Sequence, residues 1–128
     1  MMVLDASVLI AHLDEDGRHH ERARGWLLEL ADQPLVASVF TIAEVLVSPA
    51  KAGDLDRATN ALGVLGVTGV PIGDGAPARL ASLRAATGLK LPDCCVLLAA
   101  EQMHGAIATF DERLADAAMG RGLAVWRR

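Results

Sequence analysis

The chain has 128 residues with 52% hydrophobic content and a positive mean hydropathy, which fits one compact domain over residues 1–128 and excludes a disordered linker. No apolar run approaches the roughly 20 residues of a membrane-spanning helix, and Asp5 interrupts the apolar start where a signal peptide would continue, so we expect a cytoplasmic protein that contacts no membrane. The net charge of −4, at face value, argues against a protein that handles nucleic acid.

Apolar periodicity and chain breakers predict strands that alternate with helices. In the first half, the predicted elements are a strand at Met2–Leu4, helices at Ala6–Leu13 and His19–Ala31, a strand at Leu35–Ser38, a helix at Val39–Val47 that stops before Pro49, and a helix capped by Asp54 that runs to about Leu65. In the second half, they are a strand at Val67–Ile72, helices at Ala76–Thr87, ending at Gly88, and Pro92–Met103, a central strand at Ala106–Thr109, a helix at Glu112–Met119 and a last strand at Leu123–Trp126. This alternation predicts an α/β fold with three layers, in which helices cover both faces of a central parallel sheet of about four or five strands.

The predicted helix at His19–Ala31 places Ala23, Trp26, Leu27 and Leu30 on one apolar face. An apolar helix face of this kind has two interpretations. It either packs on the sheet of its own domain or forms a strip for a partner helix or a second copy of the chain. The sequence leaves both open.

Four acidic residues stand at related places in the predicted fold. Asp5 and Asp111 end apolar strand-like runs, Asp93 stands at the head of a helix, and Glu44 lies within one. Because the carboxyl ends of parallel strands share one edge of the sheet, we expect these acids to converge without cationic partners. Converging anions repel and raise one another's pKa values, a penalty that a hard cation removes, and ligands that offer only oxygen select Mg²⁺ or Mn²⁺.

Each acid also has a simpler structural explanation. Asp5 and Asp111 could cap the helices that follow them, and Asp93 could be favoured by the dipole of its own helix. Glu44 shares a polar stripe with Thr41 at helical spacing and could simply face solvent. Only the joint pattern favours a metal site.

The other polar residues restrict the chemistry further. Setting the four acids aside leaves twelve acidic residues against twelve basic ones, mostly arginine, so the remaining surface is neutral. Cys94 and Cys95 are adjacent and predicted to lie in a helix, which disfavours a disulfide between them and indicates buried packing residues. The histidines have no partner at zinc-binding spacing, so zinc is disfavoured.

Four segments resemble those of the PIN-domain ribonucleases, and in size the chain resembles the toxin member of VapC-type toxin–antitoxin pairs. The matching segments are Val3–Ile10, Thr41–Val45, Leu91–Asp93 and Ala108–Leu114. Their order and spacing cover nearly the whole chain. The resemblance implies a PIN-like fold for the three predicted layers.

The resemblance also implies roles for individual residues. The residues that it assigns to Mg²⁺ or Mn²⁺ and to catalysis are Asp5, Glu44, Asp93 and Asp111. Ser7 and Thr109 would support the site by hydrogen bonding, and Asp116 is either a further acid near the metal or a solvated helix residue. The candidate phosphate contacts, each of which a solvated surface would explain as well, are Arg18, Arg22, Lys90 and Arg113.

Such a site would hydrolyse phosphodiester bonds in single-stranded or looped RNA with a metal-activated water, and the resemblance implies products with a 5′-phosphate and a 3′-hydroxyl. It further implies a homodimer that is inhibited by a cognate antitoxin protein, whose tail occupies the groove beside the metal.

Two other functions remain as alternatives. A haloacid-dehalogenase-like phosphatase also uses an Asp after its first strand, but it typically needs a second Asp at the position of Ser7 and a lysine near the site, and this chain has only Lys51 and Lys90. A module with a PIN-like fold that binds RNA or a partner without cleaving is the other alternative. The intact set of four acids argues against that module.

Overall fold

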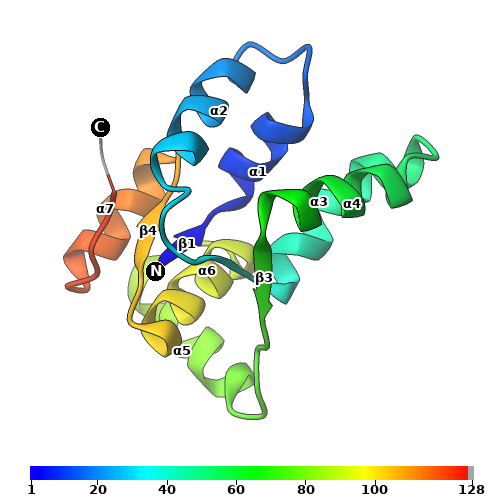
Figure 1. The fold of residues 1–128 in the computed structure, drawn as a ribbon. Coiled ribbons are helices and arrows are strands. Elements are labelled where there is room, and N and C mark those ends of the chain that lie inside the picture. Colours follow the sequence, from blue (N-terminus) through cyan, green and yellow to red (C-terminus); the bar gives the residue numbers. More distant parts are fainter. Residues whose placement is uncertain (127–128) are drawn as a thin grey trace.

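The structure is a computed structural model and describes residues 1–126. Four short strands alternate with helices along this part of the chain (Figure 1). The strands are β1 (Met2–Leu4), β2 (Leu35–Ser38), β3 (Val67–Val70) and β4 (Ala106–Ala108), and the helices are α1 (Ala6–Leu13), α2 (His20–Glu29), α3 (Val39–Lys51), α4 (Leu55–Leu65), α5 (Ala76–Thr87), α6 (Leu91–Met103) and α7 (Glu112–Gly120). The predicted α/β class is confirmed.

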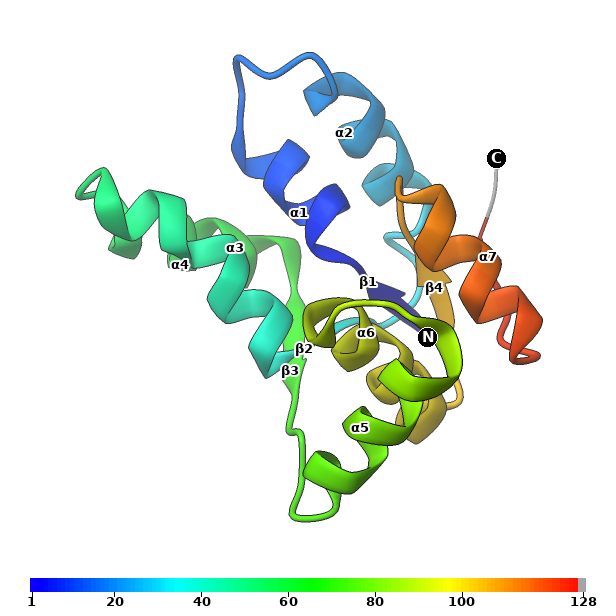
Figure 2. The same ribbon diagram turned by 180° about the vertical axis from the view of Figure 1, so that it is seen from behind.

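All pairings between the strands are parallel, and their order across the sheet is β3-β2-β1-β4. In both views of the ribbon, the α3–α4 pair projects on one side of the sheet and α7 lies on the other (Figures 1 and 2). Each pair of consecutive strands is linked through helices, as parallel pairing requires. The carboxyl ends of the strands therefore face the starts of the helices that follow them.

Alternate side chains of each strand enter two separate cores, which makes the fold three-layered as predicted. Val3 and Val36 point to the core that α5, α6 and α7 cover. Met2, Leu4 and Leu35 point to the opposite core, beneath α1, α2, α3 and α4. Both faces of the sheet are thus covered, which is the usual requirement of a parallel sheet.

The apolar face of α2 belongs to this second core. Trp26, Leu27 and Leu30 are all buried against the sheet and its neighbouring helices. The interpretation in which this face is an open strip for a partner is therefore wrong. Packing within the domain explains it.

The predicted last strand at Leu123–Trp126 is reduced to one parallel bridge, between Ile107 and Val125. Ile107 N–H donates to the carbonyl of Ala124 at 2.9 Å, and its carbonyl accepts from Trp126 N–H at 2.8 Å. Because one residue of β4 makes both bonds, no continuous ladder forms. β4 was predicted to be central, but it lies at the end of the sheet, and within residues 1–126 only this bridge lies beyond it.

Two boundaries differ from the predictions at prolines. α3 continues through Pro49 to Lys51, because the ring has a helical φ angle and the missing N–H removes only one bond near the end of the helix. The amide of Ala52 still reaches the carbonyl of Ser48 at 3.1 Å. β3 ends at Val70, before Pro71, whose nitrogen cannot donate to a ladder.

Helix ends follow the capping predictions in part. α5 ends at Gly88, whose φ of 73° is the left-handed conformation that favours glycine, as predicted. Asp54 stands at the N-cap of α4, but its side chain makes no capping hydrogen bond, so its predicted role was wrong. Its φ of −110° and ψ of 21° depart from the extended backbone that usually directs a capping oxygen at the helix. Among the described residues, no helix has the length and apolar character that crossing a bilayer requires.

Candidate active site

Asp5 is a buried carboxylate at the carboxyl end of β1, with 6% of its surface exposed. Its Oδ2 accepts hydrogen bonds from Ser7 Oγ and Thr109 Oγ1, each at 2.7 Å. Although Asp5 stands at the N-cap of α1, its side chain makes no capping hydrogen bond. Two hydroxyl donors offset the cost of burying the carboxylate, so Asp5 is held in place by its neighbours and does not serve as a cap.

The same two hydroxyls bind the turn between β4 and α7. Thr109 Oγ1 accepts from the backbone N–H of Asp111 at 2.9 Å, and Ser7 Oγ accepts from the N–H of Phe110 at 3.1 Å. The two hydroxyl oxygens are 3.5 Å apart. The β1–α1 and β4–α7 turns are therefore linked through one small network of hydrogen bonds around Asp5.

Asp111 is the N-cap of α7. Its Oδ1 accepts from the N–H groups of Arg113 at 2.9 Å and Leu114 at 3.3 Å. The explanation of Asp111 as a helix cap is therefore correct for one of its carboxylate oxygens, Oδ1. The two capping bonds occupy Oδ1 only, so capping does not use the other carboxylate oxygen.

The pKa values of Glu44 and Asp93 link all four acids. Burial raises the pKa of Glu44, and the negative charges of Asp5 and Asp93 raise it further. Burial also raises the pKa of Asp93, with additional contributions from Asp5 and Asp111. Since these effects act only over short distances, the four carboxylates share one electrostatic neighbourhood at this edge of the sheet.

Among residues 1–126, however, no group of three acidic, histidine or cysteine side chains is close enough to hold a metal ion as the side chains stand. The donor set still fits a hard cation, because it offers carboxylate oxygens whose mutual repulsion a divalent charge would remove. Cys95, whose pKa is raised to about 11 by burial, by Cys94 and by Glu44, is a protonated thiol at neutral pH and adds no soft ligand.

The comparisons with known proteins decide the family. The family model described as the PIN domain matches residues 2–119, which is nearly the whole chain. The chain belongs to the PIN domain family. No curated protein sequence matches it significantly.

Several solved structures of other proteins have the same fold as this chain. A toxin–antitoxin complex from Klebsiella pneumoniae contains a chain that is 26% identical, with a TM-score of 0.73 over 87% of each chain. FitAcB from Neisseria gonorrhoeae is 22% identical, with a TM-score of 0.76 over 99% of this chain and 97% of that chain. VapBC2 from Rickettsia felis, bound to a promoter DNA fragment, is 11% identical, with a TM-score of 0.74 over 98% and 96%.

Two basic residues of the PIN domain also act on its acids. Arg113 and Lys90 both lower the pKa of Asp93 and oppose part of the effect of the carboxylates. From the sequence, we expect the acids to converge without cationic partners. This expectation is wrong, because two cations act on them. Lys90 directly precedes α6 and Arg113 lies in the first turn of α7, so the two helix starts bring these cations to the acidic edge.

The remaining predicted residues lie elsewhere or on the surface. Asp116 is exposed on α7, and its charge is not among the causes of the raised pKa values of Glu44 and Asp93. Arg18 is exposed in the loop before α2. Arg22 lies over two aromatic rings, Phe110 and Trp26.

Thr41 was grouped with Glu44 on a stripe that could face solvent, but it is fully buried. Its hydroxyl has no hydrogen-bond partner within the described part of the chain. The stripe therefore turns inward one helical turn before Glu44. This burial argues against the simple solvent-facing explanation of Glu44.

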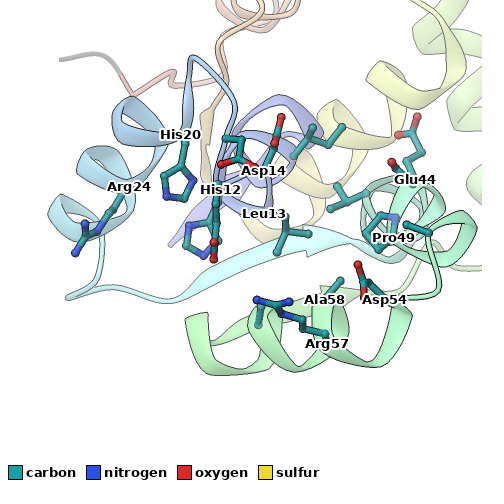
Figure 3. Close-up of a pocket in the computed structure, with 17 residues that line it drawn as sticks. His12, Leu13, Asp14, His20, Arg24, Glu44, Pro49, Asp54, Arg57 and Ala58 are labelled. Carbon is teal, nitrogen blue, oxygen red and sulfur yellow. The ribbon is translucent and has the colours of Figure 1, made fainter.

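A groove of about 750 Å³ begins beside Glu44 and runs between α1, the start of α2, α3 and α4 (Figure 3). Its apolar lining includes Ile10, Leu13 and Val45. Arg24 lines it from α2 and Arg57 from α4, and further acids line it from the α1–α2 loop. Sequence reasoning did not find this groove, because four helices from separate parts of the chain form it.

Proposed function

We propose that this PIN domain is an endoribonuclease that depends on Mg²⁺ or Mn²⁺ and hydrolyses phosphodiester bonds in RNA. One observation carries the proposal: the raised pKa values of Glu44 and Asp93, which the charges of their acidic neighbours help to cause. PIN domains are generally nucleases, so the family supports the same chemistry. Acids that repel one another at the edge of a sheet cost stability unless the site uses a cation.

In this proposal, Asp5, Glu44, Asp93 and Asp111 hold the metal. When bound, a divalent cation supplies Lewis-acid activation of water and neutralises charge at phosphorus. Ser7 and Thr109 fix the orientation of Asp5 through their bonds to its Oδ2. Because Glu44 and Asp93 are only partly buried, their side chains have room to move toward a common cation.

The basic residues of the edge bind substrate. Lys90 and Arg113 carry positive charge beside Asp93, where a phosphate of the RNA backbone would meet them. We expect products with a 5′-phosphate and a 3′-hydroxyl.

The test is cleavage of RNA by the purified protein in chelator, in Mg²⁺, in Mn²⁺ and in Zn²⁺. We expect cleavage in Mg²⁺ and Mn²⁺ only, with new 5′-phosphate ends found by sequencing. RNA binding without cleavage in any metal would contradict the proposal and support the module that binds without cleaving. The phosphatase alternative has no support from the family, and trapping of a phosphoryl-enzyme on Asp5 would be needed to revive it.

We further propose that the protein is a VapC-type toxin of the cytoplasm, and that an antitoxin segment binds in the groove beside Glu44. Several similar solved structures are toxin–antitoxin complexes. An apolar floor with charged residues around it suits an amphipathic helix or extended segment. Arg24 and Arg57 would contact acidic residues of that segment, and the acids of the α1–α2 loop would contact basic ones. A short open reading frame beside the gene is where we expect the antitoxin to be encoded.

A charge placed in the groove tests this partner. Ile10 lines the groove and is 50% exposed, whereas Val64 on α4 is 82% exposed and does not line it. Ile10→Asp should weaken inhibition by the antitoxin, and Val64→Asp should leave inhibition unchanged. Equal inhibition of both variants would mean that the antitoxin binds outside this groove. We also propose a homodimer, which light scattering of the isolated protein would reveal as twice the mass of the chain.

A further inference from the structure

Aromatic residues are scarce in this chain, and most of them gather at one place. The sequence has two tryptophans, two phenylalanines and no tyrosine. Trp26 meets Phe110 with ring centroids 4.5 Å apart and Trp126 with centroids 4.7 Å apart, in both cases edge to face. Both tryptophans and one phenylalanine therefore form a single cluster. They come from α2, from the turn after β4 and from the residue after the Val125 bridge.

An exposed arginine covers the cluster. The guanidinium carbon of Arg22 lies 4.4 Å from the centroid of the Phe110 ring and 5.1 Å from that of Trp26. Contact with two rings orders the guanidinium of this exposed residue. Arg22 is thereby held as a positioned donor group beside a surface of aromatic rings.

Arg22 and the two tryptophans line a pocket of about 330 Å³, together with Thr109, Glu112 and Val125. Phe110 does not line it, but its ring contacts Trp26 and Arg22. This volume is at the lower end of the range for sites that bind small ligands. Trp26 is buried, but Trp126 is only partly so and lines the opening. Trp126 thus does more than fill the core, because it is partly exposed and lines the pocket.

The pocket adjoins the acidic edge directly. Thr109, which lines it, donates to Asp5 Oδ2 at 2.7 Å, and Asp111 follows Phe110 in the chain. The pocket and the four acids therefore lie on two sides of the same turn between β4 and α7.

We propose that the pocket of Arg22, Trp26 and Trp126 is a subsite that holds one unpaired base of the RNA strand beside the bond that is cleaved. This proposal rests on the proposed nuclease function. Bases stack on aromatic side chains, and an ordered arginine binds the adjacent phosphate. A base within a duplex is already paired and stacked, so the subsite selects single-stranded or looped RNA.

Intrinsic fluorescence tests the subsite, because both tryptophans of the chain lie in the cluster. The experiment is a titration in chelator, without cleavage, with three probes: a short single-stranded RNA, the same strand in a duplex, and the same strand carrying abasic ribose units. We expect quenching by the single strand and little quenching by the duplex or the abasic strand. Equal quenching by the abasic strand would overturn the proposal, since it would indicate contact with phosphates alone.

Variants test the same subsite through activity. Trp126→Leu and Arg22→Gln should each lower kcat/KM for single-stranded RNA by about fivefold or more, as the loss of one stacking or cation contact predicts. Phe40→Leu is the matched control, because Phe40 is exposed on α3 and outside the cluster. It should leave kcat/KM unchanged. Arg22 is exposed, so Arg22→Gln keeps the test valid even if Trp126→Leu fails to fold.

The outcomes separate this proposal from the nuclease function. Cleavage in Mg²⁺ with unchanged kcat/KM in both variants and no quenching would overturn the subsite and leave the nuclease intact. Quenching by single-stranded RNA, without cleavage in any metal, would overturn the nuclease and support a pocket that binds bases.

Discussion

Thr109 donates a hydrogen bond of 2.7 Å to Asp5 Oδ2, although 104 positions of sequence separate the two residues. The same hydroxyl accepts from the backbone N–H of Asp111. One side chain thus joins the carboxyl ends of β1 and β4 and fixes the turn that carries another acid. It has both a donor and an acceptor role, and both of its partners lie at the candidate active site.

Replacing this hydroxyl should therefore damage stability and activity together. Thr109→Val keeps the shape but leaves Asp5 and the Asp111 N–H each without one partner, at a cost of about 1–3 kcal/mol. Thr109→Ser restores the hydroxyl and should recover most of the loss. Urea denaturation and RNA cleavage in Mg²⁺ would measure both effects. Wild-type stability of Thr109→Val would mean that the bond contributes nothing.

Removing an acid should separate stability from activity. Asp93→Asn should abolish cleavage that depends on metal, while the melting temperature in chelator stays the same or rises, because repulsion from Asp5 and Asp111 is relieved. Asp56→Asn is the matched control, since Asp56 is an exposed acid in the first turn of α4. It should leave cleavage intact. A much lower melting temperature for Asp93→Asn, with cleavage retained, would make Asp93 a structural residue.

The raised pKa values of Glu44 and Asp93 predict a pH dependence of stability without metal. At pH values above the ordinary pKa values of 4.5 for Glu44 and 3.8 for Asp93, these two side chains bind more protons in the folded state than in the unfolded state. Stability is therefore lost as pH rises from these ordinary values through the raised folded values, and the penalty is fully present above them.

The combined variant Glu44→Gln with Asp93→Asn isolates this effect. In chelator, it should be more stable than the wild type at neutral pH, and its advantage should vanish as the pH falls toward about 4. Adding Mg²⁺ should stabilise the wild type and leave the variant unaffected. An advantage that is independent of pH would contradict the electrostatic origin.

His12, which lines the groove, should give a pH dependence of stability with the opposite sign. Burial lowers its pKa below the ordinary 6.5, with a further contribution from His20, and its buried Nδ1 has no hydrogen-bond partner within residues 1–126. Its contribution to stability is present above pH 6.5 and is lost as pH falls through the lowered folded pKa. An NMR titration should find this low pKa and a higher one in His20→Gln. A value at or above the ordinary one would contradict the prediction.

The sequence predicted best where local patterns agree with tertiary packing. β1, β2 and α5 have the predicted boundaries, because apolar runs and the glycine at position 88 determine them locally. The predictions failed where the outcome depends on distant partners. Pro49 stays within α3, and among the described residues the segment at Leu123–Trp126 pairs with Ile107 alone.

The candidate site also has some features that could be predicted from the sequence and others that could not. The positions of Asp5 and Asp111 at strand ends follow from the apolar runs that precede them, so their nearness could be inferred. The aromatic cluster could not, because Trp26 and Trp126 are separated by nearly the whole chain and meet edge to face only in the folded molecule. Arg22 was a candidate phosphate contact, but its position over two rings became evident only in three dimensions.

The separation of Asp5 from Thr109 along the chain also has a consequence during synthesis. β4 is made last among the four strands, and Thr109 and Asp111 follow it in the chain. A nascent polypeptide that still lacks this part has Asp5 without one of its two hydroxyl donors and lacks one of the four carboxylates. The nuclease activity that we propose therefore requires the segment after β4 to have been synthesised and packed against β1.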